Sequence, residues 1–277
     1  MARGIELKTR GELQAMRASG VVLARAIEAM RAAVVPGMST ADVDAIGAQV
    51  ITEAGATSNF KGYHGFTGTI CASVNEEIVH GIPSPKRILQ DGDLFSIDCG
   101  CILDGWHSDS AISIHVGEPP SMAEVDLIAA ANDSMWAGIA AARANGKLGE
   151  ITAAIESSVR KSAANDGRRY GEVAGYGGHG IGSAMHMDPF VPNHGRQGKG
   201  LRLPAGTALA IEPMLTLGTS ASRELADHWT VVTKDGSRAA HVEHSIAILD
   251  DGVCVLTAAD GGVAGLAPYG VTPVSLD

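Results

Sequence analysis

Residues 94–116 read LFSIDCGCILDGWHSDSAISIHV, two strand-like runs on either side of Asp104-Gly105. This dipeptide suits a two-residue type I′ turn, so the segment predicts a β-hairpin. Because side chains alternate along a strand, Asp98 and Asp109 then point to the same face as diagonal neighbours, about 7–8 Å apart at the backbone. The predicted register pairs Leu103 with Trp106, Gly100 with Asp109 and Asp98 with Ala111.

Two aspartates on one face of a hairpin repel each other if both are ionised and shielded from water. One reading is that one or both face solvent at the edge of a sheet. The flanking residues are apolar, which favours burial, and a buried pair of carboxylates needs a positive counter-charge. Basic residues near the pair are few. A bound metal cation is therefore the better source of that charge.

Three residues far along the chain extend this acidic pair: His179 in GGHGIG, Glu212 in AIEPM and Glu243 in HVEHS. Four carboxylates and one imidazole form a mixed oxygen and nitrogen ligand set that suits two divalent cations. If the five side chains converge, the chain is a metal-dependent hydrolase. Taken alone, a glycine-flanked histidine is as often a turn residue as a ligand. His80 and His186 are further candidates for the same cleft, and each could instead be a satisfied core or surface histidine.

The chain has 277 residues, enough for one large domain or two fused halves with an ample core. Its net charge of -10 at pH 7 argues against a dedicated nucleic-acid binder, which would present a basic face. The N-terminal stretch lacks the apolar segment of a secretory signal, and no run of residues is apolar enough to span a membrane. We therefore expect a soluble, cytoplasmic protein that binds neither nucleic acid nor membrane. Its cysteines form no pair of CxxC motifs, which favours reduced core residues over disulfides: Cys71, Cys99, Cys101 and Cys254.

The remaining patterns describe the order of helices and strands. The stretch GTALAIEPML predicts a strand that ends at Glu212-Pro213, and residues 228–249 predict a second hairpin that turns at 234–237. Each half thus has helices followed by acidic antiparallel strands. The Gly-, Ala- and Pro-rich segment after about residue 258 is expected to be a loose extension. Apolar residues at helical spacing predict helices over about 12–35, 40–55, 121–144 and 149–165.

Six short motifs stand in order along residues 5–250. They are SVNEEIVHGIP (73–83), SIDCG (96–100), SDS (108–110), GHGIG with a histidine seven residues after its own, AIEPML (210–215) and VEHSIAIL (242–249). Together they resemble the type 1 methionine aminopeptidases of the pita-bread metallopeptidase family M24. The resemblance implies an α+β pita-bread fold, with a pseudo-twofold curved antiparallel sheet flanked by helices. It also implies one catalytic domain over residues 1–260, followed by a C-terminal extension over 261–277.

The resemblance also implies a chemistry. The activity would be removal of the N-terminal methionine from nascent proteins, with a preference for a small second residue. Two divalent ions (Mn, Fe, Co or Zn) would assist the hydrolysis, and Asp109 would bridge them. The implied ligands are Asp98, Asp109, His179, Glu212 and Glu243.

Catalytic roles follow from the same resemblance. Glu212 would move a proton between the attacking water and the leaving amine. His80 would contact the peptide nitrogen or orient the substrate. His186 would stabilise the developing oxyanion.

By resemblance, a small apolar pocket would receive the methionine side chain. Each of its residues could instead be an ordinary core residue. The implied lining is Tyr63, Phe66, Cys71, Met185 and Trp229, with Phe60 close by.

Three positions depart from the family pattern. Met185 stands where similar enzymes often carry an aromatic side chain, and its flexible thioether could widen the pocket. Met187 replaces the usual acidic residue after His186. His241 stands where the family often has glutamine, on the same strand face as Glu243. It is either a supporting residue behind the ligands or one that alters the choice of metal.

Other members of the fold offer alternative readings. A proline-specific aminopeptidase or dipeptidase usually carries a separate N-terminal domain of about a hundred residues, for which this chain has no room. A type 2 methionine aminopeptidase would have a large insertion between Glu212 and Glu243, where this chain has 30 residues. A non-catalytic binding module, or a metal-free creatine-type hydrolase, would lack some of the ligands. The expected partners are N-terminal methionine peptides and nascent chains, with transient ribosome contact, and the default state is a monomer.

Overall fold

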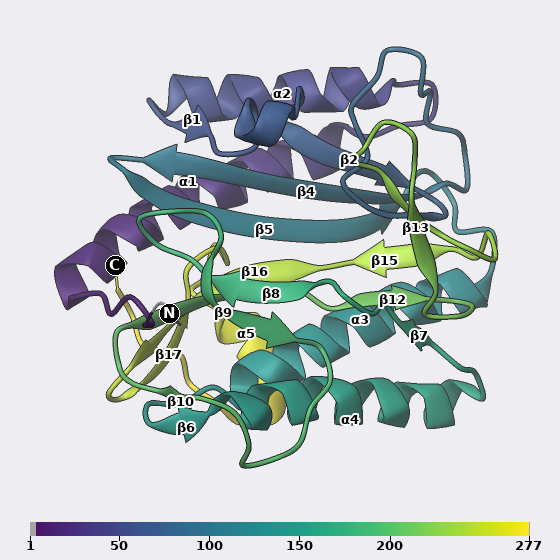
Figure 1. The fold of residues 1–277 in the computed structure, drawn as a ribbon. Helices are drawn as coiled ribbons and strands as arrows, with labels where there is room; N and C mark the ends of the chain where they lie inside the picture. Colours follow the sequence, from purple (N-terminus) through teal and green to yellow (C-terminus); the bar gives the residue numbers. More distant parts are fainter. Residues whose placement is uncertain (1–3, 277) are drawn as a thin grey trace.

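The central sheet has the strand order β1-β4-β5-β16-β11-β8-β9 in the computed structural model, which describes residues 4–276 (Figure 1). Strand β2 pairs with β4 and β17 pairs with β16, and the neighbouring strands run antiparallel. The strands are β1 (Thr57–Ser58), β2 (Ile70–Val74), β4 (Leu94–Leu103), β5 (Trp106–His115), β8 (Gly177–Gly180), β9 (Met187–Pro192), β11 (Thr207–Ile211), β16 (Glu243–Leu249) and β17 (Gly252–Val255).

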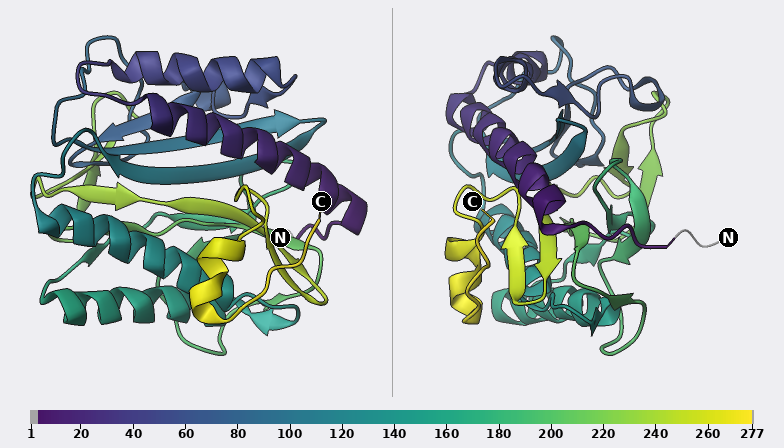
Figure 2. Two further views of the ribbon diagram at one scale, coloured as in Figure 1. Left: turned by 180° about the vertical axis from the view of Figure 1, so that it is seen from behind. Right: turned by 90° about the vertical axis from the view of Figure 1, so that its left-hand side faces the viewer.

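Helices α1 (Arg10–Ala33) and α2 (Thr40–Glu53) cover the first half of the sheet. Each begins with a capping box, as in Ser39 with Asp42, which satisfies free backbone N–H groups at the helix start. Helix α1 packs on β4 and β5, and the view from behind shows it crossing the sheet (Figure 2). Alternate residues of β4, such as Phe95, belong to the core under these helices. The other face of β4, which carries Asp98, is left for the cleft.

Helices α3 (Met122–Ala140) and α4 (Leu148–Asp166) cover the second half. Helix α3 packs on β11 and β16, and α4 packs along α3. The arrangement of the first half is thereby repeated, and the halves join where β5 pairs with β16 (Figure 1). The expectation of a pseudo-twofold antiparallel sheet flanked by helices is confirmed, and the four helices match their predicted ranges to within a few residues.

The β4–β5 hairpin has the predicted register. Leu103 pairs with Trp106, Gly100 with Asp109 and Asp98 with Ala111. Asp104 and Gly105 both have positive φ angles, 50° and 83°, as a type I′ turn requires.

The second predicted hairpin is wrong. Strand β14 (Val231–Thr233) pairs with β13 (Ser222–Glu224) and β3 (Glu77–Val79), whereas β15 (Ala239–His241) pairs with β12 (Met214–Thr216). The carboxylate of Asp235 accepts hydrogen bonds from the N–H groups of Thr219 and Ser237, so the intervening turn is fixed to a distant loop. Alternation of residue types predicts a strand, but it does not say which neighbour will supply the hydrogen bonds.

The expectation of a loose segment after residue 260 is also wrong. Residues 263–266 form α5 (Val263–Leu266), Leu266 is fully buried against the α3 side of the core, and Leu276 is buried near α1. The N–H of Val274 donates a 2.8 Å hydrogen bond to the carbonyl of Val253. The segment's composition suggested a loose chain, yet two of its leucines are buried in the core, which favours an ordered segment.

The remaining short elements lie around this framework. All four cysteines are free and buried, as predicted. Among the helices of residues 4–276, none combines the length and the apolar character that crossing a membrane requires. The other elements are η1 (Tyr63–Gly65), β6 (Gly146–Lys147), β7 (Gly171–Glu172), β10 (Arg202–Leu203) and η2 (Ala267–Tyr269).

Candidate metal centre

Five neighbouring strands bring the predicted ligands to one side of the sheet. Asp98 and Asp109 come from the β4–β5 hairpin and are 8% and 3% exposed. Glu243 opens β16 directly beside β5, Glu212 follows the last residue of β11, and His179 lies in β8, which pairs with β11. Ligand atoms of Asp109, His179 and Glu243 lie within 4.8 Å of one another. Three of the five predicted ligands thus lie together, and their role as ligands stays a prediction.

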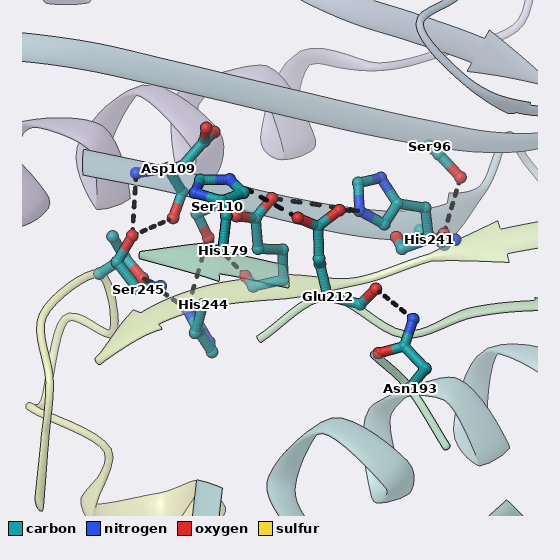
Figure 3. Close-up of polar contacts among 12 residues, drawn as sticks. Ser96, Asp109, Ser110, His179, Asn193, Glu212, His241, His244 and Ser245 are labelled. Atoms are coloured by element: carbon teal, nitrogen blue, oxygen red, sulfur yellow. Dashed lines mark hydrogen bonds and ion pairs between the residues drawn. The ribbon is translucent and has the colours of Figure 1, made fainter. Parts of the chain in front are cut away.

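Glu212 lies between two imidazoles (Figure 3). Its Oε1 is 3.6 Å from Nε2 of His179, and its Oε2 is 3.7 Å from Nε2 of His241. A second group of potential ligand atoms, from Glu212, His241 and Glu243, also lies within 4.8 Å. Asp98 belongs to neither group. His241 belongs to the second, and the sequence had suggested it either as a supporting residue behind the ligands or as one that alters the choice of metal.

The carboxylates have raised pKa values because the cleft is shielded from water. Burial raises the pKa of Asp98 to about 7, with Glu212 adding to the increase. Burial also raises the pKa values of Asp109, Glu212 and Glu243 well above their ordinary range, and neighbouring carboxylates raise those of Asp109 and Glu243 further. Without a counter-charge, this group of acids opposes its own ionisation.

A divalent cation fits this arrangement. Asp98 Oδ1, Asp109 Oδ1 and Glu243 Oε1 are buried oxygens without a hydrogen-bond partner. Buried polar atoms are normally satisfied, and unpaired carboxylate oxygens that face one another lack both a donor and a counter-charge. Cations coordinated by these oxygens would accept their lone pairs in place of a donor and supply the counter-charge, with His179 as a nitrogen ligand.

His179 is oriented for such a role. Its Nδ1 donates a 2.9 Å hydrogen bond to the carbonyl oxygen of Gly180, which leaves the lone pair on Nε2, the atom that faces Glu212. Burial lowers the pKa of His179 to about 3, with His186 adding to the decrease, so the ring is neutral near pH 7. A neutral imidazole with a fixed tautomer is the form that binds metal.

Serine hydroxyls hold the strands of the centre in register. The hydroxyl of Ser245 accepts from the N–H of Asp109 and donates to its carbonyl, at 3.0 and 2.8 Å. The hydroxyl of Ser110 donates to the carbonyl of Glu243 at 2.8 Å. The side-chain amide of Asn193 donates to the carbonyl of Glu212 at 3.0 Å. None of these residues was singled out from the sequence, although Ser110 and Ser245 stand within the motifs SDS and HVEHS.

The two other histidines singled out from the sequence lie in the same cavity, whose volume is about 700 Å³. The ring centroid of His186 is 4.4 Å from that of His179, and its Nδ1 is 3.0 Å from the hydroxyl of Tyr63. His80 follows β3 with a positive φ of 62°, and burial lowers its pKa to about 4. Both imidazoles are therefore near the candidate ligands without belonging to them.

An apolar cluster lies beside the acidic group in this cavity. Phe60, Phe66, Cys71 and Met185 are buried against one another, and Trp229 packs on Phe66 with ring centroids 5.0 Å apart. Tyr63 lines the same cavity but contacts His64 and His186 instead. The residues predicted to form the methionine pocket are thus adjacent, while their role in binding methionine stays a prediction.

We expect the metal-stripped protein to lose stability as pH rises above neutral. A carboxyl whose pKa is raised by folding favours the folded state fully below its unfolded pKa of about 4, and this contribution is lost as pH rises through the folded pKa. For Asp98, whose pKa is raised to about 7, this contribution to stability is lost as pH rises through about 7. Buried histidines such as His179 and His80, whose pKa values are lowered, act in the opposite sense below about pH 6.5. Above that pH the carboxylates dominate, so melting temperatures with a chelator should fall from about pH 7 to about pH 8.5, and saturating Mn(II) should restore more stability at pH 8.5 than at pH 7. A metal-stripped melting temperature that rises over this range would contradict the raised pKa values.

Comparison with known proteins agrees with this geometry. Residues 14–250 match the sequence pattern of metallopeptidase family M24. "Methionine aminopeptidase 1" of Mycobacterium tuberculosis is 53% identical over 255 residues, which cover 92% of this chain and 96% of that protein. The chain belongs to the methionine aminopeptidases of family M24.

Two further relatives support this membership. "Methionine aminopeptidase 1" of Bacillus subtilis is 43% identical over 250 residues, 90% of this chain and 98% of that protein. The crystal structure of a methionine aminopeptidase from Thermotoga maritima superposes with a TM-score of 0.87 at 34% identity, and covers 92% of this chain and 99% of that one. The pita-bread fold expected from the sequence is therefore confirmed.

The proline-specific alternative is related only through the fold. A prolidase from Pyrococcus furiosus superposes with a TM-score of 0.70 at 17% identity, over 91% of this chain but 65% of that one. The higher identity and the full-length match favour the methionine aminopeptidases.

Proposed function

We propose that this aminopeptidase removes the N-terminal methionine from nascent chains with two divalent cations bound in the cleft, and that it prefers a small second residue. The observation that carries the proposal is the meeting of unpaired buried carboxylate oxygens with an apolar cluster in one cavity. When bound, divalent cations polarise a carbonyl and lower the pKa of water. The five predicted ligands, Asp98, Asp109, His179, Glu212 and Glu243, would hold them. Mn, Fe, Co and Zn all suit this donor set.

The apolar cluster would select the substrate. A methionine side chain that enters between Phe66, Met185 and Trp229 would be removed from water, which gains about 0.8 kcal/mol per buried CH₂ group. The adjoining carboxylates and histidines would then lie beside the first peptide bond. Because discrimination between similar apolar side chains is modest, some activity on a norleucine-like residue is expected.

Three side chains would act on the reacting groups. Glu212 would take a proton from the attacking water and deliver it to the leaving amine. His186 would donate a hydrogen bond to the developing oxyanion, in an orientation supported by the hydroxyl of Tyr63. His80, neutral near pH 7, would contact the substrate's peptide nitrogen or orient the peptide.

The site of action follows from the substrate. Nascent chains expose their first methionine at the ribosome, so we propose cytoplasmic action with transient ribosome contact. The four free cysteines suit a reducing compartment. We further propose that the protein acts as a monomer, the default state that the resemblance to the family implies.

The decisive test uses metal-stripped protein incubated anaerobically with Met-Ala-Ser or Leu-Ala-Ser during titration with Mn(II), Fe(II) and Co(II). We expect methionine release that requires metal, with little leucine release. Met-Leu-Ser in parallel tests the preference for a small second residue. Absence of release from a folded protein with every metal would instead support a non-catalytic binding module.

Replacing Tyr63 by phenylalanine should lower kcat about tenfold, while KM for Met-Ala-Ser changes little. The substitution removes the hydroxyl that contacts Nδ1 of His186 at 3.0 Å but keeps the ring in the cavity, and about 1–1.5 kcal/mol is typical of one such hydrogen bond. Tyr176→Phe is the matched control, because Tyr176 also lines the cavity. A raised KM with unchanged kcat would show that Tyr63 acts only as a wall of the pocket.

A further inference from the structure

His241 is a buried imidazole whose ring nitrogens are both without a hydrogen-bond partner. It is 2% exposed, and its Nε2 lies 3.7 Å from Oε2 of Glu212 (Figure 3). The same atom lies 4.0 Å from Oε2 of Glu243. These separations are too long for direct hydrogen bonds. The ring therefore faces two carboxylates without being paired to either.

The spacing suits three ligands around one ion. Nitrogen and oxygen ligands about 2.0–2.2 Å from a cation lie roughly 3–3.6 Å from one another. Nε2 of His241 lies 3.7 Å from the oxygen of Glu212 and 4.0 Å from that of Glu243, slightly more than this range. A small inward movement of the side chains would close the difference.

The backbone of His241 is held firmly in this place. The hydroxyl of Ser113 accepts from the N–H of His241 at 2.9 Å and donates to its carbonyl at 2.8 Å. The same hydroxyl is 2.8 Å from that of Ser96, so β4, β5 and β15 are tied together at this point. A buried ring on a fixed backbone loses little conformational entropy when it binds an ion.

We propose that His241 is a nitrogen ligand to the cation that Glu212 and Glu243 share. This inference rests on the proposed function, in which the carboxylates hold two cations. Nε2 of His179 lies 3.6 Å from Oε1 of the same Glu212, so each oxygen of this carboxylate faces one imidazole. Imidazole favours Fe, Co and Zn over Mn, which carboxylates suit better. The second imidazole should therefore shift the metal preference of this chain away from Mn.

The test counts metal-bound histidines in the Co(II)-loaded protein by proton NMR in water. A ring bound to paramagnetic Co(II) through one nitrogen shows its remaining N–H far outside the usual spectral range. We expect two such signals in the natural protein, from His179 and His241, and one in His241→Gln. Glutamine is chosen because it is polar, of similar size, and common at this position in the family.

Metal affinity is measured in parallel by equilibrium dialysis. In His241→Gln we expect the affinity for one of two Co(II) ions to fall about tenfold or more, and the affinity for Mn(II) to fall less. His115→Gln is the matched control, because both ring nitrogens of His115 are also buried and unpaired. His115 is the last residue of β5 and does not line the cavity. This control should keep both Co(II) affinities and both shifted signals.

The outcomes separate the two proposals. A folded natural protein that binds no Co(II) would overturn the proposed metal centre itself. Two bound ions with one shifted N–H signal in the natural protein would overturn only the role of His241. A lower affinity in His241→Gln with an unchanged set of signals would likewise show a positioning residue instead of a ligand. The count in the natural protein decides the matter even if the variant does not fold.

Discussion

Asp109→Asn should abolish metal-dependent methionine release, with a loss of at least about a thousandfold in kcat/KM. Asp109 is 3% exposed, has an unpaired buried oxygen and shares its group with His179 and Glu243. An amide keeps the shape of the side chain but removes the negative charge that would hold a cation. Metal stoichiometry measured after dialysis should fall below that of the natural protein.

The same change should stabilise the metal-stripped protein. The pKa of Asp109 is raised by burial and by the carboxylates of Asp98 and Glu212, so folding opposes its ionisation. An asparagine carries no such cost at pH 8, and the melting temperature in the presence of a chelator should rise. Asp104→Asn, at the exposed turn of the same hairpin, is the control and should change neither metal binding nor activity. Full metal stoichiometry in Asp109→Asn would show that Asp109 is not a ligand.

Glu212→Gln is expected to lower kcat by about two to four orders of magnitude while the protein still folds and binds metal. The glutamine oxygen can still coordinate a cation, but the side chain can no longer take up and deliver a proton. Because Glu212 lies within 3.7 Å of both His179 and His241, its replacement also leaves two imidazoles beside a neutral group. The measurements are single-turnover rates with Met-Ala-Ser and the number of bound Co(II) ions.

A control separates this role from a general effect of neutralising a buried acid. Glu172 lies in β7, has a raised pKa through burial and has an unpaired buried oxygen, but it does not line the cavity. Glu172→Gln should leave kcat unchanged. A kcat close to that of the natural protein in metal-loaded Glu212→Gln would remove Glu212 from proton transfer.

The sequence was sufficient where interactions are local. The turn at Asp104-Gly105 sets the register of the β4–β5 hairpin, and side-chain alternation then places Asp98 and Asp109 on one face. Helix α2 was likewise predictable, because its capping residues Ser39 and Asp42 are three positions apart. The candidate ligands were identified from residue type and from the motifs of the family.

Long-range pairing was beyond such reasoning. The strands β14 and β15 were correctly expected as strands and wrongly paired with each other, because alternation does not specify the partner. The last residues were expected to be loose, since nothing local reveals that Leu266 fills a gap beside α3. The methionine pocket was proposed by resemblance, and only the fold shows Phe66 and Met185 in contact with the same cluster.

Sequence by itself determined which residues could bind metal and how one hairpin presents two of them, because a tight turn and a two-residue period act over a few positions. Only the tertiary structure decided how the centre is completed. The pairing of β5 with β16 brings Glu243 beside Asp109, and β11 sets Glu212 between His179 and His241. Those contacts join residues up to 134 positions apart. Their distances depend on packing two helix-covered halves against each other, which no local pattern encodes.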